Sequence, residues 1–169
     1  KATMSYGYGI TVTPIQLAQA YSVIANNGLY TPLSLRKGLF NESKRVINED
    51  TAKTLLSMLE KVVEDGTSKK AAINGYRVGG KSGTAWKTSG AGGYSTDRYR
   101  SIFAGIAPID DPRLVAVVFI EEPTGEFYYG GDVAAPVFSE IISQSLQLLS
   151  IPPQGFIPKP DLVADNKND

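Results

Sequence analysis

The residues best suited to chemistry in this sequence are Lys81-Ser82-Gly83-Thr84, which directly follow a pair of glycines. Alternate side chains of an extended strand share one face, so the hydroxyls of Ser82 and Thr84 are expected to point the same way. Lys81 adds a fixed positive charge. Glycine weakens a strand unless something must approach the backbone closely. We therefore interpret this stretch as a cradle for a carboxylate, with a free backbone N–H beside it.

A structural interpretation of the same residues is an edge strand whose lysine prevents strand-to-strand aggregation. A Lys-(Ser/Thr)-Gly triplet arises by chance in roughly one in ten chains of this length at average composition. The motif by itself therefore does not decide between a site and an ordinary edge strand.

The overall composition excludes several classes of function. Lys and Arg together number 17, and so do Asp and Glu, so no excess of positive charge indicates a nucleic-acid-binding protein. The chain has no histidine and no cysteine, which excludes an internal Ser-His or Cys-His pair, a Cys-based zinc site and a disulfide. We expect neither a metal nor an organic cofactor.

Helix signals lie on both sides of the motif. A Thr-x-x-Gln capping box at Thr13, followed by proline, predicts a helix from residue 14 that is capped at its end by Gly28. Asn48 is the expected N-cap of a second helix, which ends at Gly66. A last helix is expected over residues 136–149.

Strand signals occupy the part of the chain between the second helix and the last one. The predicted strands are residues 77–86, 100–107 and 114–121, with a glycine-rich polar loop between residues 87 and 98. Helices followed by successive strands and a covering helix predict an α+β fold, with an antiparallel sheet covered by helices. Residues 1–150 are expected to form the domain, and residues 151–169 a Pro-rich polar C-terminal tail.

Further stretches, in order along the chain, resemble the class B penicillin-binding proteins, and most closely the septal penicillin-binding protein 3 group. These stretches are Thr3–Ile10, Glu64-Asp65-Gly66-Thr67, Phe103–Pro108, Glu122-Pro123 and Tyr128-Tyr129-Gly130-Gly131. Lys-Thr-Gly is the third motif of penicillin-binding proteins and class A β-lactamases, and the triplet that begins at Lys81 is similar to it. The resemblance covers about residues 1–150 and implies the C-terminal portion of a transpeptidase domain with the penicillin-binding protein and β-lactamase-like fold.

The resemblance implies a role for each residue of the motif. The backbone N–H of Thr84 would help to hold a developing oxyanion, and the hydroxyls of Ser82 and Thr84 would bind the carboxylate of a substrate or a β-lactam. Lys81 would supply positive potential and a path for protons. Gly83 has no side chain, so an acyl chain could lie alongside the strand. We identify no Ser-x-x-Lys motif in this chain and no Ser-x-Asn upstream of the helix where the family carries it, so the nucleophilic serine is expected upstream of this chain.

Three tyrosines are implied to flank the same site. Tyr128 and Tyr129, and with them Tyr99, resemble the aromatic residues beside the family's active site. Tyr128 and Tyr129 are equally compatible with a rim that packs on the last helix. Both interpretations stay open at the level of the sequence.

The implied function is that of a serine D,D-transpeptidase that cross-links peptidoglycan stem peptides during septal cell-wall synthesis and is a target of β-lactams. The alternatives are a D,D-carboxypeptidase or a β-lactamase of the same fold, or a non-catalytic penicillin-binding receptor. The implied partners are stem peptides ending in D-Ala-D-Ala, β-lactam antibiotics, the N-terminal part of the same protein and other septal division proteins. No nucleic acid is expected. The resemblance also implies a single-pass anchor in the bacterial inner membrane, with the catalytic domain in the periplasm.

Overall fold

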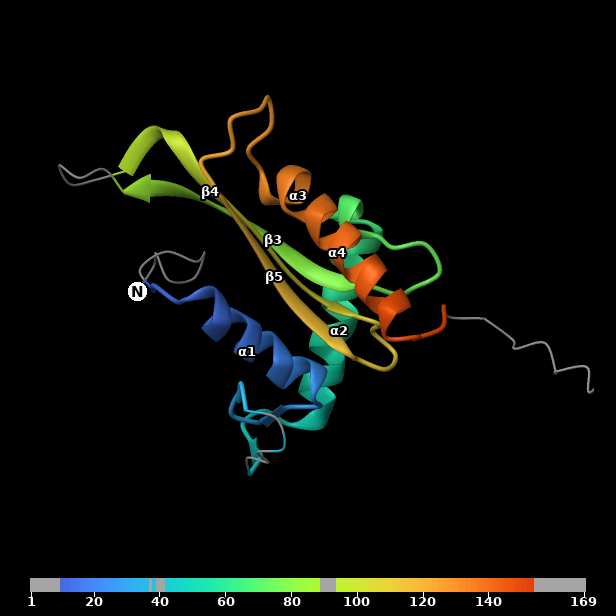
Figure 1. The fold of residues 1–169 in the computed structure, drawn as a ribbon. Helices are drawn as coiled ribbons and strands as arrows, with labels where there is room; N and C mark the ends of the chain where they lie inside the picture. The colour runs from blue at the N-terminus through green and yellow to red at the C-terminus, as the bar shows by residue number, and fades with distance from the viewer. Residues whose placement is uncertain (1–9, 37, 39–41, 89–93, 154–169) are drawn as a thin grey trace, which may run out of the picture.

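The computed structural model describes residues 10–36, 38, 42–88 and 94–153. In chain order the elements are α1 (Pro14–Ala25), β1 (Leu29–Tyr30), β2 (Lys44–Arg45), α2 (Glu49–Glu64), the 3₁₀ helix η2 (Lys69–Ala71), β3 (Gly79–Thr88), β4 (Tyr94–Ala107), β5 (Leu114–Glu121), α3 (Gly130–Val133) and α4 (Ala135–Leu148). The three long strands form an antiparallel sheet in the order β3-β4-β5, and helices lie against both of its faces (Figure 1). This is the sheet covered by helices that the order of sequence patterns predicts.

The N-terminal caps of the two long early helices form as predicted. Thr13 and Gln16 make the reciprocal capping box, with the Thr13 N–H donating to the Gln16 side chain at 2.9 Å. The Asn48 side chain accepts a hydrogen bond from the backbone N–H of Thr51 at 2.7 Å. The predicted C-cap is corrected, since the cap residue of α1 is Asn26 and not Gly28. Gly28 follows with a positive φ of 85°, which a residue without Cβ adopts at little cost.

The β3–β4 hairpin is longer than predicted. β3 continues to Thr88 and β4 begins at Tyr94, so the expected loop over residues 87–98 is too long and the expected start of the second strand at residue 100 is too late. The ladder between the two strands continues to the pair Thr88↔Tyr94, after a shift in register. Cross-strand pairing of this kind supports strand structure in residues whose local composition indicates a turn.

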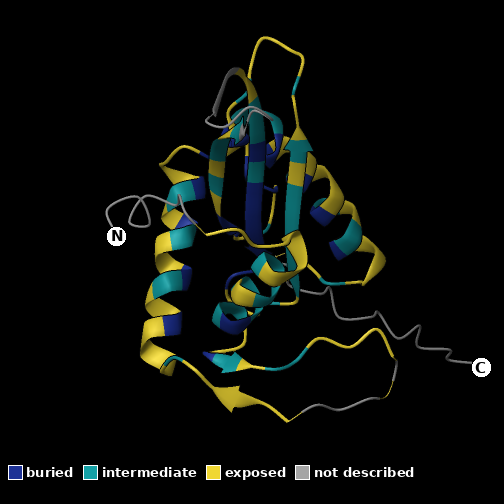
Figure 2. Cartoon of the chain, turned by 90° about the vertical axis from the view of Figure 1, so that its left-hand side faces the viewer, coloured by how far each residue is buried: buried dark blue, intermediate teal, exposed yellow. Residues whose placement is uncertain are grey.

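Two layers of apolar packing hold the sheet between helices. On one face, the ring of Phe138 from α4 meets Phe103 of β4 edge-on, with ring centroids 4.8 Å apart and both side chains fully buried. On the opposite face, Leu56 of α2 packs with Ile106 and Ile109. Figure 2 shows the buried residues concentrated on the middle of the sheet and on the helix sides that face it. The β3 motif therefore lies on a rigid, well-packed support.

The last predicted helix forms, and a short helix that was not predicted precedes it. α4 covers residues 135–148, close to the expected 136–149, but the four-residue helix α3 precedes it and was not predicted. α3 contacts both β3 and β4. Its position matters because it lies beside the motif on β3.

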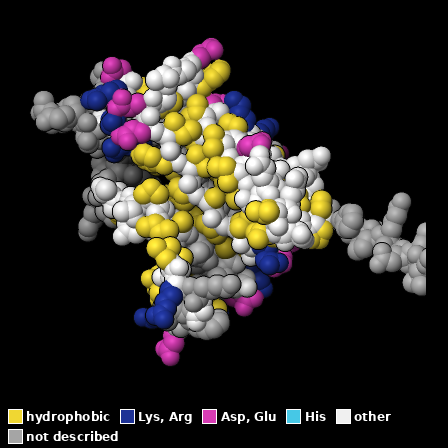
Figure 3. Space-filling model, viewed as in Figure 1, with side chains coloured by type: hydrophobic (Ala, Val, Ile, Leu, Met, Phe, Trp, Pro, Cys, Tyr) yellow, Lys and Arg dark blue, Asp and Glu magenta, His cyan; other side chains and the backbone are white. Residues whose placement is uncertain are grey.

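The outer side of β5 is unpaired among the described residues. Most residues of β5 are half-buried, and Phe119 is exposed. Figure 3 shows apolar side chains gathered across the centre of this view of the molecule, where β5 lies between α1 and α4 in Figure 1. An unpaired strand with apolar side chains is a template for pairing with further polypeptide.

Residues 151–153 follow α4 and still contact the domain. The hydroxyl of Tyr76 donates to the carbonyl of Ile151 at 2.7 Å. Residues 154–169 lie outside the described part of the chain, so the predicted boundary at residue 150 stays a prediction. Within the described ranges, each helix is too short or too polar to cross a membrane.

Candidate active site

Ser82 and Thr84 lie on the same face of β3, as their alternation predicts. The Ser82 hydroxyl is 3.4 Å from the hydroxyl of Thr67, in the turn before η2. The Thr84 hydroxyl accepts a hydrogen bond from the backbone N–H of Gly130, at the start of α3, at 3.0 Å. Both hydroxyls therefore face the side of the sheet on which η2 and α3 lie.

Lys81 belongs to the opposite face of the same strand, because neighbouring residues of a strand alternate. Its side chain is exposed, and the ammonium donates to the carbonyl of Ser82 at 2.7 Å. The cation therefore lies beside the backbone of the motif. An ammonium has three hydrogens to donate, so the contact with this carbonyl leaves it able to bind a further acceptor.

β3 is the outer strand of the sheet within the described residues, since it pairs with β4 alone. Alternate backbone N–H and C=O groups of an antiparallel outer strand point away from its partner. Gly83 is exposed, and the nearest neighbour to an added Cβ is a side-chain atom of Ile102 at 3.9 Å. An extended peptide or an acyl group can therefore approach this edge, in the way that peptides add to exposed sheet edges in other proteins.

The three predicted tyrosines form one aromatic group beside this strand. Tyr99 of β4 and Tyr128 are stacked, with ring centroids 4.0 Å apart and planes inclined by 16°. Tyr128 also lies against Tyr129, with centroids 4.4 Å apart, and donates its hydroxyl to that of Tyr129 at 3.1 Å. The hydrogen bond to Tyr129, with some desolvation, raises the pKa of Tyr128 to about 12. Tyr128 therefore packs on a strand tyrosine, and the role of the three tyrosines beside an active site stays a prediction.

The segment that carries these tyrosines is anchored to the sheet by Ser101. Ser101 is fully buried on β4, directly opposite Thr84, and its hydroxyl donates to the backbone carbonyl of Tyr128. Sequence reasoning missed Ser101, and it also missed Thr67. Their nearness to the motif depends on strand register and on the fold of a turn, for which the sequence carries no local signal.

The two glycines after Tyr129 allow α3 to lie directly on the strands. A Cβ added to Gly130 would be less than 3.0 Å from the carbonyl oxygens of both Ile102 and Gly83. A Cβ added to Gly131 would be equally close to the carbonyl oxygen of Thr67. Because these neighbours are backbone atoms, they cannot swing aside, and only glycine fits at either position.

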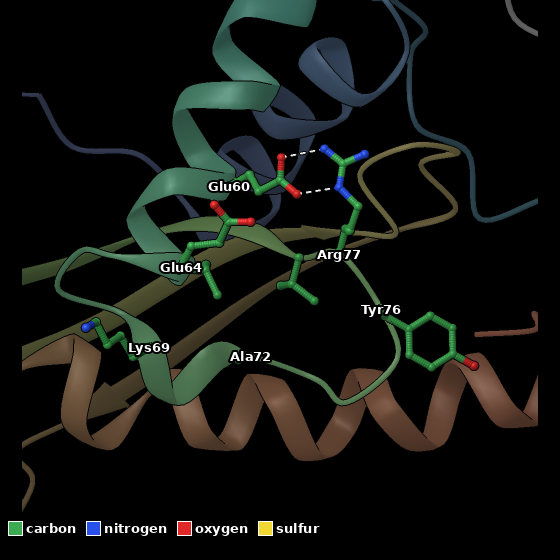
Figure 4. A pocket seen from close by; sticks show the side chains of 8 residues that line it. Glu60, Glu64, Lys69, Ala72, Tyr76 and Arg77 are labelled. Carbon is green, nitrogen blue, oxygen red and sulfur yellow. Dashed lines mark hydrogen bonds and ion pairs between the residues drawn. The ribbon is translucent and has the colours of Figure 1, made fainter. Parts of the chain in front are cut away.

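A separate pocket of about 240 Å³ lies between α2, η2 and the segment that leads into β3 (Figure 4). Both carboxylate oxygens of Glu60 accept hydrogen bonds from Arg77, at 2.5 Å and 2.6 Å. Glu60 is only 6% exposed, and the guanidinium satisfies its charge. None of the predicted site residues lines this pocket. We interpret the ion pair as a tie between α2 and the start of β3.

The expectation that the chain has no Ser-x-x-Lys is wrong as far as spacing goes, because this spacing occurs from Ser34 to Lys37, ahead of the motif on β3. Ser34 is exposed and directly precedes a bend, and its hydroxyl accepts from the backbone N–H of Arg36 at 3.0 Å and donates to the carbonyl of the same residue at 3.1 Å. Lys37 lies outside the described residues. Ser34 therefore lies in a loop after β1 and not on a helix, so it does not supply a nucleophile of the expected kind.

Comparison with solved structures defines the class of protein. The transpeptidase domain of penicillin-binding protein 3 from Burkholderia pseudomallei is similar, with a TM-score of 0.82 and 46% sequence identity over 90% of this chain and 47% of that one. The sheet, its covering helices and the outer strand with the Lys-Ser-Gly-Thr motif are thus those of a penicillin-binding protein, and the predicted fold class is confirmed.

The family follows from the sequence. Residues 1–143 match the family described as the penicillin binding protein transpeptidase domain, and the chain belongs to this family. A curated relative named probable peptidoglycan D,D-transpeptidase PbpC, from Pseudomonas aeruginosa, is 46% identical over 99% of this chain and 30% of its own length. Peptidoglycan D,D-transpeptidase FtsI of Escherichia coli is 43% identical over 90% of this chain and 26% of its own length. The predicted resemblance to class B penicillin-binding proteins near the penicillin-binding protein 3 group is confirmed, and the chain spans less than a third of either curated relative.

Proposed function

We propose that the intact protein is a peptidoglycan D,D-transpeptidase that acts in septal cell-wall synthesis. The family match and the names of the curated relatives support this activity. The observation that carries the proposal is that the hydroxyls of Ser82 and Thr84 lie on one face of β3, an outer strand of the sheet. Gly83, between them, has no side chain to block the edge of this strand. Such a strand can bind an extended acyl chain along its edge and a carboxylate at its hydroxyls.

The proposed chemistry is a two-step acyl transfer. A serine hydroxyl upstream of this chain attacks the carbonyl carbon of the penultimate D-alanine, and the terminal D-alanine leaves with a proton on its amine. The amine of a second stem peptide then attacks the ester, forming the cross-link and returning the proton to the serine. A β-lactam follows the first step, with its ring nitrogen as the leaving group that stays attached.

Each residue of the motif has a proposed part in the first step. The Thr84 backbone N–H donates to the oxyanion that develops on the attacked carbonyl, and a donor of this kind is typically worth about 3 kcal/mol in the transition state. The hydroxyls of Ser82 and Thr84 bind the terminal carboxylate. Lys81, which is beside the Ser82 carbonyl, adds positive potential and a path for protons. Gly83 leaves room for the acyl chain.

The aromatic group is proposed to bind the apolar part of the ligand. Tyr99, Tyr128 and Tyr129 are joined by stacking and a hydrogen bond, so they offer one continuous surface. The raised pKa of Tyr128 keeps its own hydroxyl protonated well above physiological pH. Such a surface favours aromatic or apolar side chains over charged ones.

The test of this function uses the intact protein and a fluorescent penicillin. Lys81→Ala should slow acylation by orders of magnitude, whereas Lys53→Ala, which changes an exposed lysine of α2 in an ion pair with Glu49, should leave it unchanged. An unchanged acylation rate in folded Lys81→Ala protein would remove Lys81 from the site. The products formed from a stem peptide separate the alternatives. A transpeptidase transfers the acyl group to a second amine, a carboxypeptidase or β-lactamase releases the acyl group to water, and a receptor retains it without turnover.

The wider setting of the protein is also part of the proposal. We propose stem peptides ending in D-Ala-D-Ala and β-lactams as ligands, and septal division proteins and the N-terminal part of the same protein as partners. The unpaired, partly apolar edge of β5 supports the last of these. We also propose a single-pass inner-membrane anchor with this domain in the periplasm, and fractionation of cells that express the intact protein tests it.

A further inference from the structure

One ion pair joins η2 to α3, close to the contacts of the two hydroxyls that are proposed to bind a carboxylate. The ammonium of Lys70, in η2, is 2.8 Å from a carboxylate oxygen of Asp132, in α3. The same ammonium is 5.3 Å from the ring centroid of Phe127, which precedes the tyrosine segment. Lys70 therefore contacts the chain on both sides of the Tyr128–Gly131 segment.

The ion pair closes a ring of contacts around the motif. Thr67, three residues before Lys70, brings its hydroxyl to that of Ser82. Gly130, two residues before Asp132, donates its N–H to the hydroxyl of Thr84. The Ser82 hydroxyl thus has a contact in the turn that leads into η2 and the Thr84 hydroxyl has one on α3, and the Lys70–Asp132 pair joins η2 to α3.

The Gly130 contact determines what the Thr84 hydroxyl can do. A hydroxyl carries one hydrogen and two lone pairs, and the Gly130 N–H occupies one lone pair. Among the described residues the Thr84 hydroxyl makes no second hydrogen bond, so its hydrogen is left to donate. A carboxylate needs a donor of this kind, because an ionised carboxylate can only accept.

From this geometry we propose that Lys70 and Asp132 are positioning residues for carboxylate recognition. By holding η2 against α3, the ion pair sets the spacing between Thr67 and Gly130 and so orients the hydroxyls of Ser82 and Thr84 toward a ligand carboxylate. This inference rests on the proposed function, since it assigns a cause to the preference of that site for an acidic ligand.

The test measures acylation of the intact protein by benzylpenicillin and by its methyl ester, which lacks the charged carboxylate. Lys70→Met and Asp132→Asn should each lower the second-order rate constant for the acid by about two- to fivefold, the range that a partly exposed ion pair supports. The rate constant for the ester should change much less, so the ratio of acid to ester falls. The double variant should be no slower than either single variant, and exchange of the two residues, Lys70→Asp with Asp132→Lys, should restore part of the loss.

A matched control comes from α2. Lys53 is 2.6 Å from Glu49 in an ion pair whose side chains are similarly exposed, and Lys53→Met should change neither rate constant. An equal loss of acid and ester rates in Lys70→Met would show a general structural effect and overturn the inference. No change in either rate would also overturn it. If the unsubstituted protein is acylated by neither compound, the proposed function itself fails, and this inference fails with it.

Discussion

Gly130→Ala offers the sharpest test of how closely α3 packs on the strands. The added Cβ would be 2.5 Å from the carbonyl oxygen of Gly83 and closer still to that of Ile102. Real Cβ atoms essentially never approach within 3.0 Å of such atoms, so α3 or the strands must move by about half an ångström or more. The movement also lengthens the hydrogen bond from the Gly130 N–H to Thr84, which is 3.0 Å in the structure.

The expected cost has two parts. Overpacking of a tightly packed site costs about 1–3 kcal/mol. Loss of one hydrogen bond adds about 1 kcal/mol. Together they predict a loss of about 2–4 kcal/mol in the free energy of unfolding, which lowers the melting temperature of the intact protein.

The assay is a thermal melt of the intact protein, combined with acylation by a fluorescent penicillin. Gly125→Ala is the matched control, because Gly125 lies in the same connection between β5 and α3 and an added Cβ there meets nothing within 4 Å. We expect Gly125→Ala to leave both the melting temperature and the acylation rate nearly unchanged. If Gly130→Ala is as harmless as Gly125→Ala, α3 does not lie against the strands in the manner described.

Two further predictions concern the ion pair beside α2 and the tyrosine group. Arg77→Met should lower the free energy of unfolding, measured by urea denaturation, by about 1–3 kcal/mol, because it leaves the nearly buried Glu60 carboxylate without its partner. Glu60→Gln should cost less, because it removes the buried charge itself, and equal losses would contradict this reasoning. Tyr129→Phe should lower the pKa of Tyr128 from its value of about 12 toward 10, measured by ultraviolet absorbance of tyrosinate against pH. The pKa of Tyr128 is higher in the folded than in the unfolded protein, so the contribution of Tyr128 to stability is complete below about pH 10 and is lost as pH rises toward 12. An unchanged titration of Tyr128 in the Tyr129→Phe protein would show that the hydrogen bond to Tyr129 does not raise this pKa.

Local signals in the sequence were sufficient for several parts of the fold. The capping box at Thr13 and the Asn48 cap mark helix starts because their hydrogen bonds span only three residues. The alternation of Ser82 and Thr84 places two hydroxyls on one face because the side-chain period of a strand is two. The motif and its resemblance to penicillin-binding proteins could be recognised for the same reason, since all of its residues are adjacent in the chain.

Only the tertiary structure decided which distant residues surround the motif. The register that sets Ser101 opposite Thr84, and the start of β4 at Tyr94, depend on pairing between strands and not on local composition. The pair Lys70–Asp132 joins residues 62 positions apart, and α3 is too short to carry a periodic signal. The sequence by itself determined the chemical groups on β3. Packing of α3 and of the turn before η2 against that strand determined which lone pairs and hydrogens of these groups stay available to a ligand.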